Sequence, residues 1–130
     1  MTIEADILDH LASDVNVTSI VDDKIFSRRH PPKVNAPFIV FRRVSTLSTM
    51  SHDGPGLRGA RFEFACWGSD GTESGRLRRA VANAFDVVRT ATFWSFIETE
   101  LEAEFPTASL PRSFVDVRLW YDAQAEFAAS

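Results

Sequence analysis

The most regular alternation of hydrophobic and polar residues lies between Gly59 and Trp67. One set of alternate positions is apolar, and the set between them carries most of the charge. The first set is Ala60, Phe62, Phe64 and Cys66, and the second is Arg61, Glu63, Ala65 and Trp67. A period of two is typical of a β-strand whose two faces meet different surroundings. We therefore expect a strand here, with its apolar face in the core.

A second strand is predicted at residues 38–45, where both faces begin apolar and end basic, at Arg42 and Arg43. Residues 46–58 lie between the two strands and contain the sequence Asp53-Gly54-Pro55-Gly56. This composition predicts a loop that projects from the body of the protein. Strands joined by a loop of this length are most easily antiparallel, and such loops are often functional.

A helical period is found on either side of these strands. Residues 2–13 predict a helix with Thr2 as its N-cap. Its expected apolar face consists of Ile3, Ile7, Leu8 and Leu11. Asp70 and Glu73 predict a capping box at the start of a second helix. The apolar face of that helix is expected to consist of Leu77, Val81, Ala84, Phe85 and Val88.

Shorter elements are expected between the first helix and the first long strand. Residues 17–21 predict a turn, and residues 24–27 a short strand with Ile25 inward. Residues 28–37 contain three prolines, which exclude a helix and a central strand and predict a surface loop.

The C-terminal third predicts one clear strand and one ambiguous segment. Residues 113–121 alternate as a strand, with one side formed by Val115, Val117, Leu119 and Tyr121. In residues 91–105, apolar residues recur every four positions as in a helix, yet residues 97–102 also alternate as a strand with an acidic face. The order of elements predicts an α+β fold: a single domain over residues 1–130, with helices packed on one face of an antiparallel sheet. Residues 123–130 are expected to fray or to pack on a neighbour.

Composition narrows the class of protein. A chain of 130 residues with 45% hydrophobic and 25% charged residues is ordinary for a globular domain. The single cysteine, Cys66, excludes an internal disulfide and fits a reducing compartment. The acidic N-terminus has no long apolar run, so we expect no signal peptide. No stretch approaches the ~20 apolar residues of a membrane span, so no membrane partner is expected.

Charge is distributed unevenly along the chain. The net charge of −4 argues mildly against nucleic acid as the main ligand. Residues 24–61 nevertheless hold eight basic residues against one acid, whereas residues 98–130 hold seven acids against two arginines. These charges are either solvated strand faces or the basic and acidic sides of one molecule. A molecule of the second kind suits head-to-tail association.

The side chains that carry chemistry form no convincing constellation. His10, His30, His52 and Cys66 are scattered, without the paired spacing of a zinc site. Residues 53–59 are glycine-rich but lack the lysine and Ser/Thr of a phosphate-binding loop. Glutamates 98, 100, 102 and 104 fit either a cation cluster or the solvated face of an edge strand. We therefore predict no catalytic site, no metal and no cofactor.

An ordered series of segments resembles a known family. The most specific is residues 53–67: an Asp-Gly-Pro loop, then Leu-x-x-Ala-Arg, then a strand ending in Cys-Trp. Around it lie residues 23–26, 36–45, 73–85 and 115–121, the last ending in Trp-Tyr. Together they resemble the tail completion, or tail terminator, proteins of long-tailed bacteriophages, related prophages and gene transfer agents. The resemblance covers roughly residues 1–90 and 112–122, and residues 91–112 depart from the pattern.

The resemblance implies a structural virion protein without catalytic activity. Such a subunit assembles as a ring, commonly a hexamer, which caps the tail tube, stops its polymerisation and links the tail to the head. The implied partners are other copies of the chain, the major tail tube protein and the head connector or adaptor protein. DNA would pass through the lumen of the ring without sequence-specific binding.

The uneven charge supplies candidate contacts for such a ring. We predict that Arg42, Arg43, Arg58 and Arg61 meet Glu98, Glu100 and Glu102 of the next subunit, while the loop with His52 and Asp53 reaches the neighbour or the tube. The alternative function is a small nucleic-acid-binding module that uses residues 24–61. A third alternative, a small enzyme or ligand-binding domain, would need a deep pocket with converging polar groups.

Overall fold

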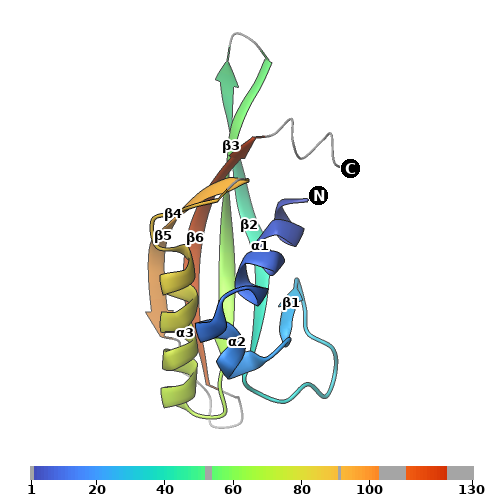
Figure 1. Cartoon of the computed structure of the whole chain (residues 1–130), viewed down its shortest axis with the longest axis vertical. Coiled ribbons are helices and arrows are strands. Elements are labelled where there is room, and N and C mark those ends of the chain that lie inside the picture. The colour runs from blue at the N-terminus through green and yellow to red at the C-terminus, as the bar shows by residue number, and fades with distance from the viewer. Residues whose placement is uncertain (1, 52–53, 91, 103–110, 123–130) are drawn as a thin grey trace.

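The computed structural model describes residues 2–51, 54–90, 92–102 and 111–122. These residues form three helices and six strands (Figure 1). The helices are α1 (Ile3–Ala12), α2 (Val15–Val21) and α3 (Gly71–Phe85). The strands are β1 (Ile25–Ser27), β2 (Phe38–Ser51), β3 (Gly54–Trp67), β4 (Val88–Arg89), β5 (Phe93–Glu102) and β6 (Arg112–Asp122). The predicted α+β class is confirmed.

The strands form one sheet in the order β1-β2-β3-β6-β5-β4. Only β1 and β2 are parallel, and every other neighbouring pair is antiparallel. The three helices lie on the same face of the sheet (Figure 1), as the sequence predicted. We call this face the covered face and the opposite one the open face, which carries no helix among the described residues.

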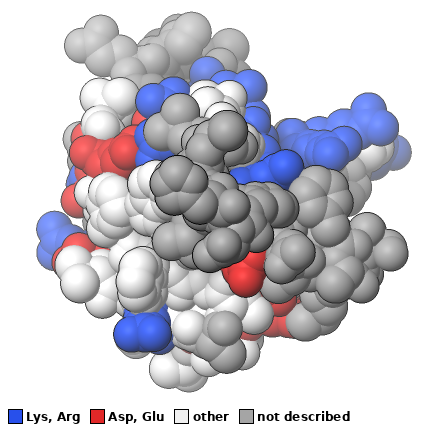
Figure 2. Space-filling view, turned by 90° about the horizontal axis from the view of Figure 1, so that it is seen from above, with Lys and Arg blue, Asp and Glu red and all other residues white. Residues whose placement is uncertain are grey.

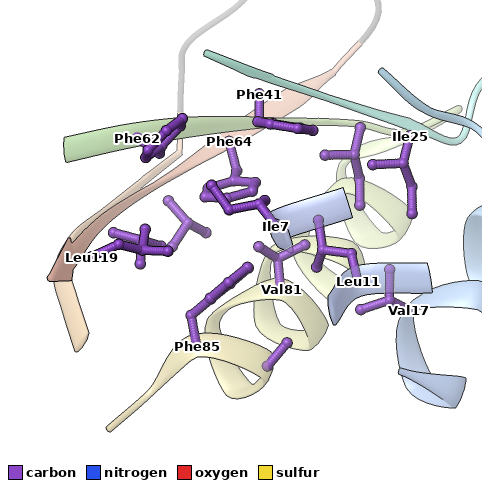
Figure 3. Close-up of a cluster of buried hydrophobic side chains, with 14 of the residues drawn as sticks. Ile7, Leu11, Val17, Ile25, Phe41, Phe62, Phe64, Val81, Phe85 and Leu119 are labelled. Carbon is purple, nitrogen blue, oxygen red and sulfur yellow. The ribbon is translucent and has the colours of Figure 1, made fainter. Parts of the chain in front are cut away.

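The core fills the space between the helices and the covered face (Figure 3). Its strand residues include the apolar alternate positions predicted above: Ala60, Phe62, Phe64 and Cys66 of β3 with Val115, Val117, Leu119 and Tyr121 of β6. The aromatic rings interlock, with the Phe64 ring 5.5 Å from that of Phe41 and 5.0 Å from that of Phe85, centroid to centroid. Burial of such side chains contributes roughly 1.5–3 kcal/mol each, so this face supplies most of the stability.

Helix α1 follows its prediction, with one exception. The Thr2 hydroxyl accepts a hydrogen bond from the Ala5 amide at 3.2 Å and caps the first turn. Ile3, Ile7 and Leu11 are buried, as their spacing required. Leu8 is exposed, so its assignment to the apolar face was wrong. It lies about 100° around the helix from Ile7, beyond the strip that contacts the sheet.

Residues 17–21 belong to a helix, and the predicted turn was wrong. The Asp14 carboxylate accepts hydrogen bonds from the amides of Asn16 and Val17 and starts α2. Val17 and Val21, one helical turn apart, are both buried. Because the helix has only 7 residues, it offers too few apolar positions to be distinguished from a turn by periodicity.

The capping box of α3 is present in a shifted form. The Asp70 carboxylate accepts from the Glu73 amide at 2.8 Å, while the Glu73 carboxylate accepts from the amide of Ser69 rather than Asp70. Leu77, Val81, Ala84 and Phe85 are buried, as predicted. The helix ends at Phe85, so the assignment of Val88 to its apolar face was wrong. Val88 begins β4, after Val87 with its positive φ of 50°.

The sequence did not predict the strand structure found within two segments, residues 46–58 and residues 91–105. Residues 46–51 and 54–58 continue β2 and β3 as paired strands, so the long loop predicted at residues 46–58 was wrong. The ambiguous segment is a strand, β5, from Phe93 to Glu102. The expected behaviour of residues 123–130 lies outside the described residues.

Candidate assembly surface

The β2–β3 hairpin extends beyond the rest of the sheet as an arm (Figure 1). Its outer rungs pair Ser48 with Arg58 and Ser51 with Gly54. β6 accompanies β3 only as far as the pair of Asp122 with Leu57. Beyond that point, the two strands of the arm pair only with each other among the described residues. The arm therefore extends past β6, and its backbone has no further neighbouring strand among the described residues.

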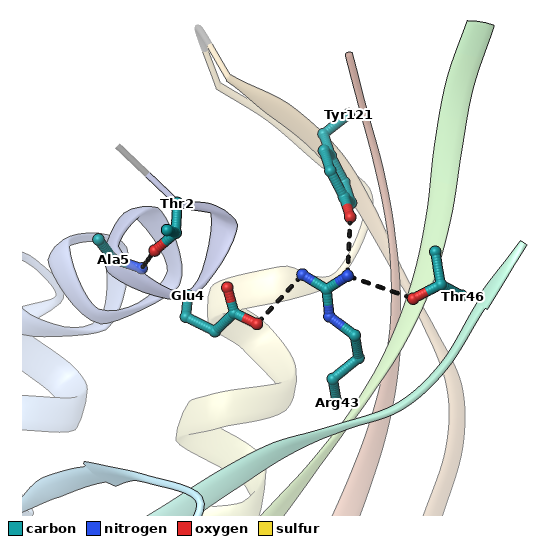
Figure 4. Close-up of polar contacts among 6 residues, drawn as sticks. All are labelled: Thr2, Glu4, Ala5, Arg43, Thr46 and Tyr121. Carbon is teal, nitrogen blue, oxygen red and sulfur yellow. Dashed lines mark hydrogen bonds and ion pairs between the residues drawn. The ribbon is translucent and has the colours of Figure 1, made fainter. Parts of the chain in front are cut away.

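Arg43 fixes the base of the arm to the body (Figure 4). Its guanidinium donates to Tyr121 Oη at 3.1 Å, to Thr46 Oγ1 at 3.2 Å and to Glu4 Oε1 at 3.1 Å. It also lies 5.4 Å from the centroid of the Phe62 ring. Charge-assisted hydrogen bonds in a half-buried position hold their partners firmly. Helix α1, β2 and β6 are thus tied together where the arm leaves the sheet.

The open face carries charges in two neighbouring rows across the strands. The first row reads Arg42 (β2), Glu63 (β3), Asp116 (β6) and Thr99 (β5), and the second reads Ser45, Arg61, Arg118 and Phe96. Arg42 Nε donates to Glu63 Oε1 at 3.2 Å, and Arg118 Nε donates to Glu98 Oε1 at 2.9 Å. Opposite charges on neighbouring strands stabilise a sheet modestly, whereas the like charges of Glu63 opposite Asp116 and of Arg61 opposite Arg118 oppose strand pairing.

Aromatic and aliphatic side chains lie on both sides of the charged rows. On one side Trp120 is paired across the strands with Trp94, and the Trp120 ring lies over Gly59. On the other side Trp67 stacks on Phe38 at 5.4 Å between centroids, and the Arg112 guanidinium lies 5.0 Å from the centre of the Trp67 ring. Large aromatic residues flanked by charge are typical of protein interfaces.

Two members of the charged rows, Asp116 and Arg61, are placed where burial is unfavourable for them. Burial raises the pKa of the Asp116 carboxyl above its usual range. Nearby Glu63 and Glu98 also raise this pKa, and Arg61 and Arg42 lower it. The buried Arg61 Nε has no hydrogen-bond partner within the described part of the chain. A buried donor without a partner costs about 1–3 kcal/mol, so this position is not optimised for the stability of an isolated chain.

The structure divides the predicted basic contacts between the two faces. Arg42 and Arg61 lie on the open face, and Arg42 is the more accessible, with 62% of its side chain exposed. Arg43 lies on the covered side, in the network described above. Arg58 is half-buried on β3, opposite Tyr121 of β6. The four arginines therefore do not form one patch.

The predicted acidic contacts are divided in the same way. Glu98 binds Arg118 on the open face, whereas Glu100 Oε1 accepts from Arg78 of α3 at 3.3 Å on the covered side. Glu102 ends β5, opposite Ser113 of β6. His52 and Asp53 lie outside the described residues. Figure 2, which looks down on the molecule, shows basic side chains gathered on the right of the view and a group of acidic side chains on the left, with some basic side chains beside the acidic ones.

Sequence reasoning missed three members of the charged rows: Glu63, Asp116 and Arg118. The alternation of β3 and β6 could have identified them, because each occupies a position on the polar face of one of these two strands. What the sequence did not reveal was which strands lie side by side. Without the order β2-β3-β6-β5, the rows cannot be assembled from separate strands.

The described residues offer little to a catalytic or metal centre. They hold no group of three His, Cys, Asp or Glu side chains close enough to bind a metal ion. Cys66 is fully buried, and burial raises the pKa of its thiol, which keeps it protonated and unreactive. Within the same described ranges, no helix is long and apolar enough to cross a membrane.

Comparison with known proteins adds a family and a structural likeness. The family model described as "Tail completion protein gp17" matches residues 5–122. The fold is similar to a chain of a solved structure titled "Virion of native gene transfer agent (GTA) particle", with a TM-score of 0.74 and 11% sequence identity. That similarity covers 94% of this chain and 96% of the other. No curated protein sequence matches the chain significantly.

Proposed function

Because the chain belongs to the tail completion protein gp17 family, we propose that it forms a ring that caps the phage tail tube and ends its polymerisation. Family membership makes the chain a structural protein of the virion tail, and structural proteins of this kind are typically not enzymes. The predictions of the family and of a virion location are confirmed. What we propose beyond the family is that the chain assembles into a capping ring, which we expect to be a hexamer.

The arm is the observation that carries this proposal. Beyond Leu57 the two strands of the arm, where Met50 pairs with Pro55 and Ser51 with Gly54, have only each other as neighbouring strands among the described residues. An ordered hairpin that extends from a small domain suits contact with a second protein at the end of a tube. The network of Arg43 holds the base of the arm and thereby sets its direction.

The open face supports assembly in a second way. It combines charged rows with accessible aromatic residues, and no helix covers it within the described ranges. In a ring this face can meet a neighbouring copy, the tail tube protein or the head connector. DNA then passes through the lumen without sequence-specific contacts, as the family resemblance implied.

The proposal is tested by the mass and shape of the assembled protein. Light scattering measures the mass of the purified chain, and negative-stain imaging follows with and without assembled tail tubes. A ring, or density that caps one end of a tube, is the expected result. A monomer that never decorates a tube end would contradict the proposal. If that monomer also bound DNA at physiological ionic strength, a nucleic-acid-binding function that uses residues 24–61 would replace the proposal of a capping ring.

Charge reversal tests the candidate contacts within the ring. Arg42→Glu and Arg58→Glu alter the basic candidates, and Glu100→Arg alters an acidic one. Arg79→Glu, an exposed arginine of α3, is the matched control. We expect the first three variants to weaken ring formation and the control to leave it unchanged. Rings that form equally well in all four variants would exclude these charges as contacts.

A further inference from the structure

We propose that neighbouring copies join edge to edge, with the outer edge of β2 in one copy forming backbone hydrogen bonds with the outer edge of β5 in the next. The proposal rests on the ring of the preceding subsection and adds the way in which its subunits are joined. Each copy would extend the sheet of its neighbour, as a strand does when it adds to an exposed sheet edge.

Both edges are open over most of their length. β1 pairs only with residues 39–41 of β2, and β4 pairs only with residues 94–95 of β5. Residues 42–51 and 96–102 therefore have a strand on one side only among the described residues. Such edges carry rows of unpaired N–H and C=O groups, and proteins usually shorten or cover them.

Charges and register shifts protect both edges in part, but two other features favour pairing with a further strand. Neither residues 42–51 nor residues 96–102 contain a proline. Phe96 and Leu101 of β5 are 40% and 58% exposed, and Val44 of β2 is also exposed. An accessible, partly apolar edge without proline favours pairing with another chain. In a protein that assembles, this property is useful.

Charge selects which edges can meet. Residues 42–51 contain Arg42 and Arg43 and no acid, whereas residues 96–102 contain Glu98, Glu100 and Glu102 and no base. Two β5 edges would bring six carboxylates together, and two β2 edges would bring four arginines together. Like charges opposite each other oppose pairing, and unlike charges favour it. The β2 edge therefore selects the β5 edge of another copy.

Unlike edges produce head-to-tail association. A contact between two different surfaces of the same chain continues from copy to copy, and it closes into a ring when the rotation allows. The two edges lie at opposite sides of one sheet, separated by β3 and β6. Each copy can therefore bind one neighbour on each side at the same time.

Strand direction and height are compatible with this contact. β2 and β5 run in opposite directions, since each step from β2 to β3, β6 and β5 is antiparallel. A copy in the same orientation would thus pair its β2 antiparallel to β5. Within the sheet, Arg42 is level with Thr99 and Arg43 is level with Ile97. A neighbour at equal height therefore brings the free residues 42–45 of β2 opposite the free residues 96–99 of β5, with Arg42 and Arg43 beside Glu98.

Hydrogen exchange of the assembled protein tests the pairing in any register. In an unpaired edge strand, the amides that point outward exchange rapidly, while those bonded to the neighbouring strand are protected. We expect residues 42–45 and 96–99 of the ring to be protected like the doubly paired residues 59–67, with the outward amides slowed about tenfold or more. Rings in which those amides exchange without protection would overturn the edge pairing while leaving the ring itself intact.

Val44→Pro is the matching variant. Val44 lies at the register shift between Arg43 and Ser45 and has no paired residue on β3. Proline there removes a donor and blocks the edge, whereas the control Val44→Ala keeps the N–H. We expect Val44→Pro to stay monomeric at concentrations where Val44→Ala forms rings. Equal assembly of the two variants would overturn the proposal.

The two proposals fail in different ways. Absence of any oligomer from the unmodified chain, with or without tube ends, would remove the ring and the edge pairing together. Rings without protected edges would remove only the edge pairing. Should Val44→Pro fail to fold, as circular dichroism would reveal, the exchange measurement on the unmodified ring still decides.

Discussion

The two faces of the sheet are built from the same strands but have different tasks. On the covered face, Phe62 and Phe64 of β3 are fully buried beneath the helices. On the open face, the residues between and beside them, Arg61 and Glu63, are half-buried and charged. One residue along the strand separates a position that stabilises the fold from a position available for assembly. Substitutions should therefore separate into two classes according to the face that they alter.

The largest expected effect comes from an aromatic residue on each face. Phe64→Ala removes a fully buried ring and should lower the free energy of unfolding by about 3–5 kcal/mol. Phe96→Ala, on the open face, should cost less than about 1 kcal/mol, because the ring is already partly hydrated. Urea denaturation followed by circular dichroism measures both. Similar losses from the two variants would mean that the faces do not differ in the way described.

A smaller difference is expected between two ion pairs. Arg43 and Glu4 leave 26% and 27% of their side chains exposed, whereas Arg42 in the pair with Glu63 is 62% exposed. Double-mutant cycles with Arg→Met and Glu→Gln should give a coupling of about 1–2 kcal/mol for the first pair and about 0–0.5 kcal/mol for the second. A larger coupling energy for the Arg42–Glu63 pair than for the Arg43–Glu4 pair would contradict the expectation that polar contacts on the covered side stabilise the fold more.

Glycine substitutions sharpen the comparison further. A Cβ at Gly59 would lie 2.7 Å from the Trp120 ring, so Gly59→Ala must displace that ring. We expect a loss of about 1 kcal/mol, with a change in tryptophan fluorescence. Gly71→Ala, where a Cβ meets nothing within 4 Å, is the control and should be neutral or stabilising. An unchanged fluorescence spectrum in Gly59→Ala would show that Trp120 does not rest on Gly59.

The smallest effect concerns the pH dependence at Asp116. Because burial raises its pKa in the folded state, the ionised carboxylate destabilises the fold relative to the protonated form. This penalty is absent below the ordinary value of 3.8 and develops as pH rises through the raised folded-state pKa. Asp116→Asn should thus raise the melting temperature slightly at pH 7 and leave it unchanged near pH 3. A lower melting temperature at pH 7 would contradict this sign.

Much of the fold could be predicted because local patterns agreed with the final packing. The alternation in β3 and β6 identified the buried positions correctly, and side-chain caps located the starts of α1 and α3. The arm was missed for a physical reason. Residues 46–51 show no apolar alternation, and Gly54-Pro55-Gly56 has the composition of a loop although it forms a paired strand.

The candidate contacts could be predicted only in part. Arg42 and Arg43 are adjacent in a strand, so their positions on opposite faces follow from the sequence alone. Glu98 and Glu100 are two residues apart and should share a face, yet the register shift between Ile97 and Thr99 sends them to opposite sides. A count of charges along the chain does not show on which face each charged side chain lies. That depends on the order of the strands and on the register shift between β5 and β6.

The position of β6 has a consequence for the order of folding. It is the last strand in sequence that the structure describes, yet it lies in the middle of the sheet, where Val117 pairs with Phe62 more than fifty residues earlier. Pairing between such distant segments forms slowly. Until residues 112–122 insert, the edges of β2 and β5 do not belong to one sheet. A chain that is still being synthesised can form the β2–β3 hairpin but cannot present both edges at their final spacing. Synthesis of residues 112–122 thus becomes a checkpoint that keeps shorter chains out of the assembly.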